Sequence, residues 1–318
     1  MWFIETGWSG AVAALEQVMQ GARLRGLSVR ALVVASPDCL TSQSVPSHVI
    51  AQILKFCHQW GLVVIADEVL YGDSSRWAEA APVSVRGVLA SAEPLVQSSL
   101  QMFSVNSLAR GEGLRGCFCE AVNCEPGVVA ALRMLVRMGA APSALGQLAL
   151  CLKLRPPAPG DASFESHLRE METARASLLQ RAGDIVQALD KLTNVQCRYS
   201  HGALHCISYV TLPASVQAAA VASGLTPDEF YCSALLAETG ILVSPGSVFE
   251  GMGLENIIRG GQVCFLMAVT LPEERVSDIL ARFARFNERF MGEVGVDGDL
   301  VASYMDLVLN CVSHRAKL

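Results

Sequence analysis

The sequence predicts an α/β protein in which a partial large domain, built on a mostly parallel sheet, precedes a smaller α+β domain. Short apolar runs without alternation, at residues 31–35 and 62–66, are typical of strands buried on both faces, and a helical apolar period separates them. After a proline-rich stretch at 155–160, long helical periods mix with further strand patterns. This order predicts one domain built on a parallel sheet, followed by a second domain that contains both helices and strands.

The first strand pair forms a βαβ unit. A helical period over residues 12–23 leads into the run at 31–35. A second period begins at Pro46 and ends before Gly61, which stops the helix, and the run at 62–66 follows at once. We therefore expect two parallel neighbouring strands with a helical crossover.

The rest of residues 1–154 completes the predicted large domain. Two further strands are expected at 94–100 and 114–121, followed by helices at 126–138 and 142–153.

Residues 155–292 are predicted to form the small α+β domain. The prolines at its start cannot continue a helix, and Ser163 can cap a long charged helix that reaches about residue 190. The pattern then predicts strands at 195–199, 204–211 and 263–271, two helices before residue 241, and an amphipathic helix over 273–290. Residues 293–318 form a tail that fits no element of the pattern.

Composition narrows the function classes. The net charge is −6 and the basic residues are dispersed, which argues against a nucleic-acid partner. No apolar run reaches the roughly 18 residues of a membrane span, and the early Glu5 is unlike a secretory signal, so we expect no membrane association and a cytoplasmic location. The six histidines lack ligand spacing and the eleven cysteines include no C-x-x-C pair, so we expect no metal site.

Six sequence segments are informative because of their order and spacing along the chain. They are VRALVV at 29–34, KFCHQWGLVVIADEV at 55–69, RG at 115–116, PPAPGD at 156–161, FYC with ETGI at 230–241, and VSPGSVF at 243–249. In this order and at nearly this spacing they resemble alanine aminotransferases of the class I/II (fold type I) family, which depend on pyridoxal 5′-phosphate. The resemblance covers residues 2 to about 290. It implies amino-group transfer between alanine and 2-oxoglutarate, and either a homodimer or a heterodimer with a related aminotransferase subunit.

The resemblance implies three cofactor-binding residues. Asp67 stands where the family has the carboxylate that faces the pyridine nitrogen of the cofactor. Arg115 stands where an arginine pairs with the cofactor phosphate, a task that suits a guanidinium. The expected tyrosine three residues after the aspartate is replaced by Leu70, and the neighbouring Tyr71 is the candidate substitute.

At other positions, this chain has residues that differ chemically from the functional residues of the family. The Schiff-base lysine belongs nine residues before the phosphate-binding arginine, where this chain has Asn106, and no lysine occurs between Lys55 and Lys153. An amide can neither bind the cofactor covalently nor move the substrate's α-proton. Cys39 replaces an asparagine that bonds the cofactor ring, and Met267 replaces the arginine that holds the substrate carboxylate.

The resemblance also begins partway through the family's large domain, which predicts an amino-terminally truncated relative. We therefore expect a pseudoenzyme of the alanine aminotransferase family that is inactive alone, with no covalent cofactor and with non-covalent binding left open. Two alternatives stay open, namely an active pyridoxal-phosphate-dependent aminotransferase and the truncated product of a longer aminotransferase gene.

Overall fold

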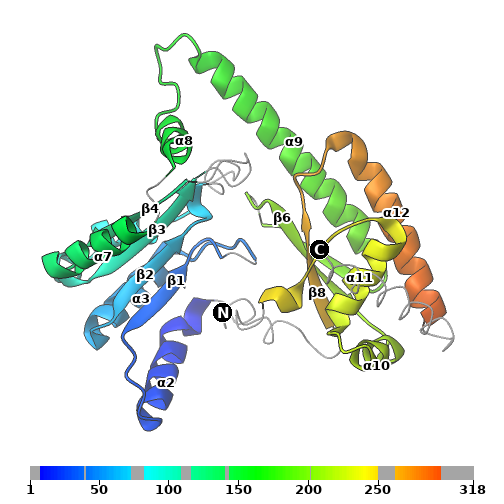
Figure 1. The fold of residues 1–318 in the computed structure, drawn as a ribbon, viewed down its shortest axis with the longest axis horizontal. Helices are drawn as coiled ribbons and strands as arrows, with labels where there is room; N and C mark the ends of the chain where they lie inside the picture. Colours follow the sequence, from blue (N-terminus) through cyan, green and yellow to red (C-terminus); the bar gives the residue numbers. More distant parts are fainter. Residues whose placement is uncertain are drawn as a thin grey trace. The chain divides into compact units, whose positions relative to one another are not determined.

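The chain forms two compact units (Figure 1). The computed structural model describes residues 8–38, 41–72, 82–108, 116–139, 143–200, 202–249 and 262–294. The larger unit comprises residues 2–170 with 201–203, and the smaller comprises residues 171–200 and 204–318, with Met1. The division falls within helix α9 (Phe164–Asp190), so the domain boundary predicted after residue 154 stays a prediction.

The larger unit is built on a four-stranded sheet of order β1-β2-β3-β4. Its strands are β1 (Ala31–Ala35), β2 (Val63–Glu68), β3 (Met102–Leu108) and β4 (Gly116–Val122). The first three strands are parallel and β4 is antiparallel to β3. The predicted α/β class and mostly parallel sheet are confirmed.

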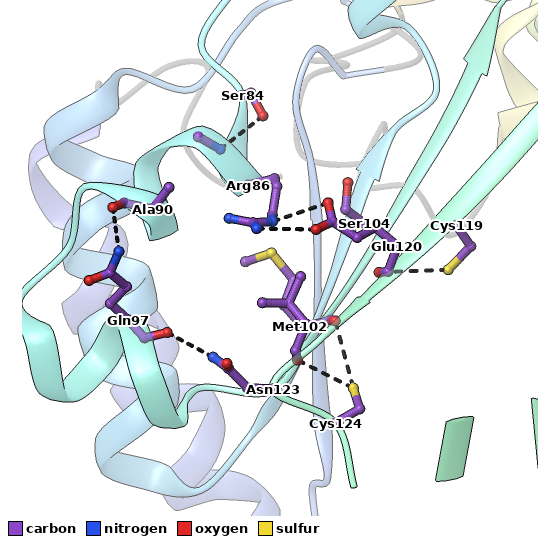
Figure 2. A network of polar contacts seen from close by, with 12 residues as sticks. Ser84, Arg86, Ala90, Gln97, Met102, Ser104, Cys119, Glu120, Asn123 and Cys124 are labelled. Carbon is purple, nitrogen blue, oxygen red and sulfur yellow. Dashed lines mark hydrogen bonds and ion pairs between the residues drawn. The ribbon is translucent and has the colours of Figure 1, made fainter. Parts of the chain in front are cut away.

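The strand predicted at 94–100 was wrong, because this segment forms the helix α6 (Pro94–Ser99). Pro94 occupies the first turn, where the missing N–H costs no helical hydrogen bond. The side-chain amide of Asn123 donates to the carbonyl oxygen of Gln97 at 2.8 Å (Figure 2). It also donates to the carbonyl oxygen of Leu100 at 2.9 Å, and the two bonds satisfy acceptors at the helix end. The neighbouring strand begins only at Met102.

Helices cover one face of this sheet. They are η1 (Trp8–Gly10), α2 (Ala11–Leu24), α3 (Ser47–Trp60), α5 (Val85–Ala90) and α6. Val64, Ala66 and Met102 are fully buried there with Ile50 and Leu54 of α3. On the opposite face the side chain of Val33 is 61% exposed, so the described helices leave part of that face uncovered.

Two further helices of the larger unit present apolar side chains to solvent. No residue of α7 (Pro126–Met138) is buried, and in α8 (Ala144–Leu154) only Ala149 is. Exposed apolar residues recur at helical spacing, and together they define the α7–α8 surface: Val128, Leu132, Leu135, Val136, Leu145, Leu148 and Leu152. Each of the two helices thus exposes several apolar side chains, and exposed apolar surface is a feature of association sites.

The smaller unit contains a second four-stranded sheet, of order β5-β6-β8-β7. Its strands are β5 (Val195–Arg198), β6 (His205–Thr211), β7 (Ser244–Pro245) and β8 (Gln262–Ala268), and all pairings are antiparallel. Its remaining elements are the carboxyl-terminal part of α9, α10 (Ala214–Ala222), α11 (Pro227–Thr239), η2 (Gly246–Phe249) and α12 (Glu273–Val294). The tail predicted at 293–318 lies outside the described residues beyond Val294.

Gly246 lies too close to β8 to carry a side chain. An added Cβ would overlap the Sγ of Cys264 and approach its carbonyl oxygen to 3.0 Å. We expect Gly246→Ala to lower the free energy of unfolding by about 1–3 kcal/mol, measured by urea denaturation. Gly183→Ala in α9 is the matched control, since no atom lies within 4 Å of its added Cβ, and it should raise that free energy by about 0.5–1 kcal/mol. Equal stabilities of the two variants would contradict this packing.

Candidate site at the carboxyl edge of the parallel sheet

Polar residues gather where the parallel strands of the larger unit end. Asp67 and Glu68 are the last residues of β2, and Asn106 lies in β3 as the register partner of Glu68. Ligands of open α/β sheets bind at this edge. Successive side chains of a strand point to opposite faces, so the side chains of Asp67 and Glu68 lie on opposite faces of the sheet.

Glu68 is the centre of a buried network on the helix-covered face. Glu68 is only 1% exposed. Its carboxylate accepts a hydrogen bond of 2.7 Å from the N–H of Val85 and another of 2.7 Å from the hydroxyl of Ser104. The side-chain amide of Asn106 in turn donates to the Ser104 oxygen at 2.9 Å. Asn106, which the sequence resemblance predicts at the Schiff-base-lysine position, is therefore held on the Glu68 face.

Sequence reasoning singled out Asp67 but missed Ser104. The available signal was the spacing of Ser104 and Asn106, which are two residues apart and so share a face of any strand. Because these two residues are polar, they interrupt the apolar pattern, and the strand that contains them was not predicted.

Asp67 lies on the opposite, partly uncovered face. It is half-buried, and its Oδ1 accepts a hydrogen bond of 3.1 Å from the N–H of Val69. Leu70 is buried in the turn that follows β2, and Tyr71 is half-buried in the helical residues after this turn. Tyr71 thus lies three residues beyond the end of β2, and the sheet separates the side chains of Asp67 and Asn106.

The described residues do not fit a covalently held pyridoxal phosphate. Asn106 offers an amide, and it faces away from Asp67. Lys55 lies on the exposed surface of α3, where its Nζ pairs with Glu93 at 3.2 Å. Arg115 and Cys39 fall outside the described residues, so the structure does not test their predicted positions.

Met267 lies in the smaller unit and is only 3% exposed in β8. It is the register partner of Cys206, whose thiol donates to the Met267 carbonyl oxygen at 3.5 Å. The thioether is thus a core side chain, and it supplies no cation for a substrate carboxylate.

A cavity of about 400 Å³ also lies in the smaller unit, between α11 and the segment 242–248. Its lining is mostly apolar and includes Leu236, Leu242 and Val248. The carboxylate of Glu229 is engaged at the start of α11, where it accepts from the N–H and hydroxyl of Thr226 at 2.9 Å each. None of the predicted cofactor-binding residues lines this cavity.

Within the described ranges, the helices all fall short of the combined length and apolar character that crossing a bilayer requires.

Comparison with known proteins identifies the family. The family model of aminotransferase class I and II matches residues 3–268. Glutamate–glyoxylate aminotransferase 1 of Arabidopsis thaliana is 32% identical over 289 residues, which cover 89% of this chain and 58% of the relative. The mitochondrial alanine aminotransferase 1 of the same plant is 32% identical over 292 residues, which cover 91% of this chain and 52% of the relative.

The fold agrees with these sequence matches. An alanine aminotransferase from Pyrococcus furiosus superposes with a TM-score of 0.61 at 17% identity, covering 84% of this chain and 60% of that chain. The chain spans little more than half the length of the relatives it matches. Pyridoxal phosphate is the cofactor of the family that these matches define. The chain belongs to the class I and II aminotransferases.

Proposed function

We propose that this chain is a divergent alanine aminotransferase-like protein that does not catalyse transamination on its own. The proposal rests on Asn106, which stands at the lysine position and donates its amide hydrogen to Ser104. Transamination needs an amine that binds the cofactor covalently and then carries the substrate's α-proton. Since no lysine occurs between Lys55 and Lys153, no residue near Asn106 in the sequence supplies that amine.

Non-covalent cofactor binding is the second part of the proposal. Asp67, Tyr71 and Arg115 are the residues proposed for it. Asp67 is supported by its place at the carboxyl end of a parallel strand. Arg115 is supported by the fit of a guanidinium to a phosphate group.

The test is an alanine and 2-oxoglutarate transaminase assay on the purified chain supplied with pyridoxal phosphate. We expect turnover at least ~10²-fold below that of Arabidopsis alanine aminotransferase 1 assayed in parallel, because acid/base catalysis by the lysine is lost. Borohydride treatment followed by peptide mapping should find no stoichiometric cofactor label. Alanine turnover that a carbonyl reagent abolishes would support the alternative of an active aminotransferase.

The length of the relatives favours a second candidate, that the chain is part of a longer aminotransferase. The matched regions cover only 58% and 52% of the two Arabidopsis proteins. Translation of the genomic sequence before Met1 distinguishes the candidates, because an open frame that continues into a phosphate-binding segment would favour the longer product. The proposal of inactivity predicts that even this longer product carries Asn106 and fails in the same assay.

We further propose that the chain pairs with an aminotransferase-family chain, either a second copy or a related subunit, through the α7–α8 surface. Support comes from apolar side chains such as Leu135, which is 63% exposed. Light scattering and co-purification with a related aminotransferase should detect the complex, and Leu135→Glu should abolish it. Leu168→Glu, at an exposed position of α9, is the control that should leave it intact. A chain that stays monomeric and recovers no related subunit would contradict the pairing.

The cytoplasmic location also stays a proposal, and fractionation of cells that express the chain would test it.

A further inference from the structure

The backbone direction of the edge strand β1 follows from its hydrogen bonds to β2. The N–H of Val63 donates to the carbonyl oxygen of Arg30 at 3.0 Å, and the N–H of Ser36 donates to the carbonyl oxygen of Asp67 at 3.1 Å. The N–H and C=O groups of successive residues in a strand point alternately to its two neighbours. The even-numbered residues of β1 therefore direct their backbone groups to β2.

The odd-numbered residues of β1 direct their backbone groups away from the sheet. These residues are Ala31, Val33 and Ala35, and the first two are exposed. In the part of the chain that the structure describes, no hydrogen bond reaches the N–H or C=O groups of the three residues. A row of such groups is the template with which a sheet pairs another strand.

The strand β1 also lacks the features that protect sheet edges. Its five residues, Ala-Leu-Val-Val-Ala, include neither a charge nor a proline. The other edge strand of this sheet, β4, carries the charged Glu120, and Leu150 of α8 lies against its Gly116. The edge strands of the second sheet, β5 and β7, have only four and two residues. Among the described edges, β1 is the one suited to accept a further strand.

Helix α2 lies beside this open edge. In the helix layer, α3 contacts both α2 and α5, and α5 contacts β2, so α2 occupies the end of the layer nearest β1 (Figure 1). Met19 of α2 belongs to the same core cluster as Val34 of β1. A strand added beyond β1 would therefore run next to α2.

The side of α2 that faces away from α3 is apolar and exposed. The guanidinium carbon of Arg23 lies 4.3 Å from the ring centroid of Trp60, which identifies the side of α2 that faces α3. Val18 lies five residues before Arg23 and so ~140° around the helix from it. The side chain of Val18 is 61% exposed. An apolar side chain of an added strand could cover it.

We propose that β1 is a docking edge for an extended segment of another polypeptide, which joins the sheet as a further strand. The segment forms hydrogen bonds with the outward N–H and C=O groups of Ala31, Val33 and Ala35. Its side chains on the helix-covered face are apolar and lie next to Val18 of α2. Main-chain hydrogen bonds give strand addition its affinity, and the side-chain contacts give it selectivity. This docking uses neither helix of the α7–α8 surface, so it is independent of the pairing proposed there.

The test is residue-resolved amide exchange of the full chain, measured by NMR with and without the synthetic peptide Lys-Lys-Val-Thr-Val-Thr-Val-Lys-Lys. In the free, dilute chain the amides of Val33 and Ala35 should exchange faster than those of Leu32 and Val34, which point to β2. At a peptide concentration of about ten times its dissociation constant, exchange at Val33 and Ala35 should slow ~10-fold. Slow exchange of these two amides without peptide would overturn the proposal, and so would unchanged exchange at millimolar peptide.

Matched variants show whether the backbone of β1 makes the contact. The same peptide methylated at every valine and threonine nitrogen should not bind, and equal binding of both peptides to the wild-type chain would overturn the proposal without any variant that has to fold. Val33→Pro removes an outward N–H and no donor to β2, so it should abolish binding, whereas Val33→Ala keeps that N–H and should retain it.

A second copy of the chain is the competing occupant of this edge. Amide protection of Val33 and Ala35 that rises with protein concentration in the absence of peptide would identify it and would overturn the proposal of a different partner. Protection that is independent of protein concentration and requires the peptide is the expected result.

Discussion

Replacement of Glu68 by alanine is expected to lower the free energy of unfolding of the larger unit by about 3–5 kcal/mol. The carboxylate is buried and accepts hydrogen bonds from the N–H of Val85 and the hydroxyl of Ser104. Alanine leaves both donors without an acceptor, at about 1–3 kcal/mol each, and it also leaves a cavity. Because Val85 is the first residue of α5, the substitution further removes a carboxylate from a helix N-terminus.

Two variants separate these contributions in urea denaturation followed by circular dichroism. Glu68→Gln keeps the volume but turns an NH₂ group towards one of the donors, so we expect an intermediate loss. Glu93→Ala removes an exposed carboxylate that pairs with Lys55, and such surface pairs contribute about 0–1 kcal/mol. A Glu68→Ala protein as stable as Glu93→Ala would show that the network does not hold the sheet to α5.

Replacement of Tyr231 by alanine is expected to destabilise the smaller unit by about 3–5 kcal/mol, as for other buried aromatic residues. Tyr231 is fully buried, with its ring centroid 6.0 Å from Phe265, 5.5 Å from Phe286 and 5.4 Å from Phe290. Its hydroxyl donates to Oδ1 of Asn287 at 2.9 Å. Alanine therefore removes contacts with three aromatic rings, from the two elements β8 and α12, and a buried hydrogen bond.

Tyr231→Phe isolates the hydroxyl. It keeps the ring and leaves Asn287 Oδ1 without this donor, so the expected loss is about 1–2 kcal/mol. Burial raises the pKa of Tyr231 well above its usual value, so the folded state favours the protonated phenol. Its contribution to stability is complete below the unfolded pKa of about 10 and declines as the pH rises beyond it.

Thermal unfolding across the alkaline range measures both effects. The wild-type protein should lose stability above about pH 10 more steeply than Tyr231→Phe, in which this ionisation is absent. Equal stabilities of the phenylalanine and alanine variants would indicate that the ring contributes nothing to the core. Identical pH profiles of wild type and Tyr231→Phe would contradict the raised pKa.

Local patterns predicted the strands whose sequences are apolar over several consecutive residues, although the burial of these strands on both faces was wrong, because Val33 is 61% exposed. The runs at 31–35 and 62–66 are apolar throughout, and both form strands of the parallel sheet. The strand β3 escaped prediction because Ser104 and Asn106 interrupt its apolar pattern. Ser104 is buried only because Glu68, 36 residues earlier, accepts its hydrogen bond, and no local pattern contains that partner.

Motif spacing located the candidate site residues but not the direction of their side chains. Asp67 and Asn106 were assigned by resemblance. Which face of the sheet each one occupies depends on the register between β2 and β3, which pairs Asp67 with Val105 and Glu68 with Asn106. Register is set by the pairing of distant segments, so the sequence of either strand alone does not determine it.

Restoring a lysine at position 106 would not place an amine beside Asp67. An Asn106→Lys substitution would direct the new ammonium group to Ser104 and Glu68, where an ion pair with the buried carboxylate would hold it. Slipping β3 by one residue would reverse every side chain of the strand, and it would also drive Met102 out of the core. Placing the side chain of residue 106 on the Asp67 face would therefore require an insertion or deletion in β3 together with a redesigned interior.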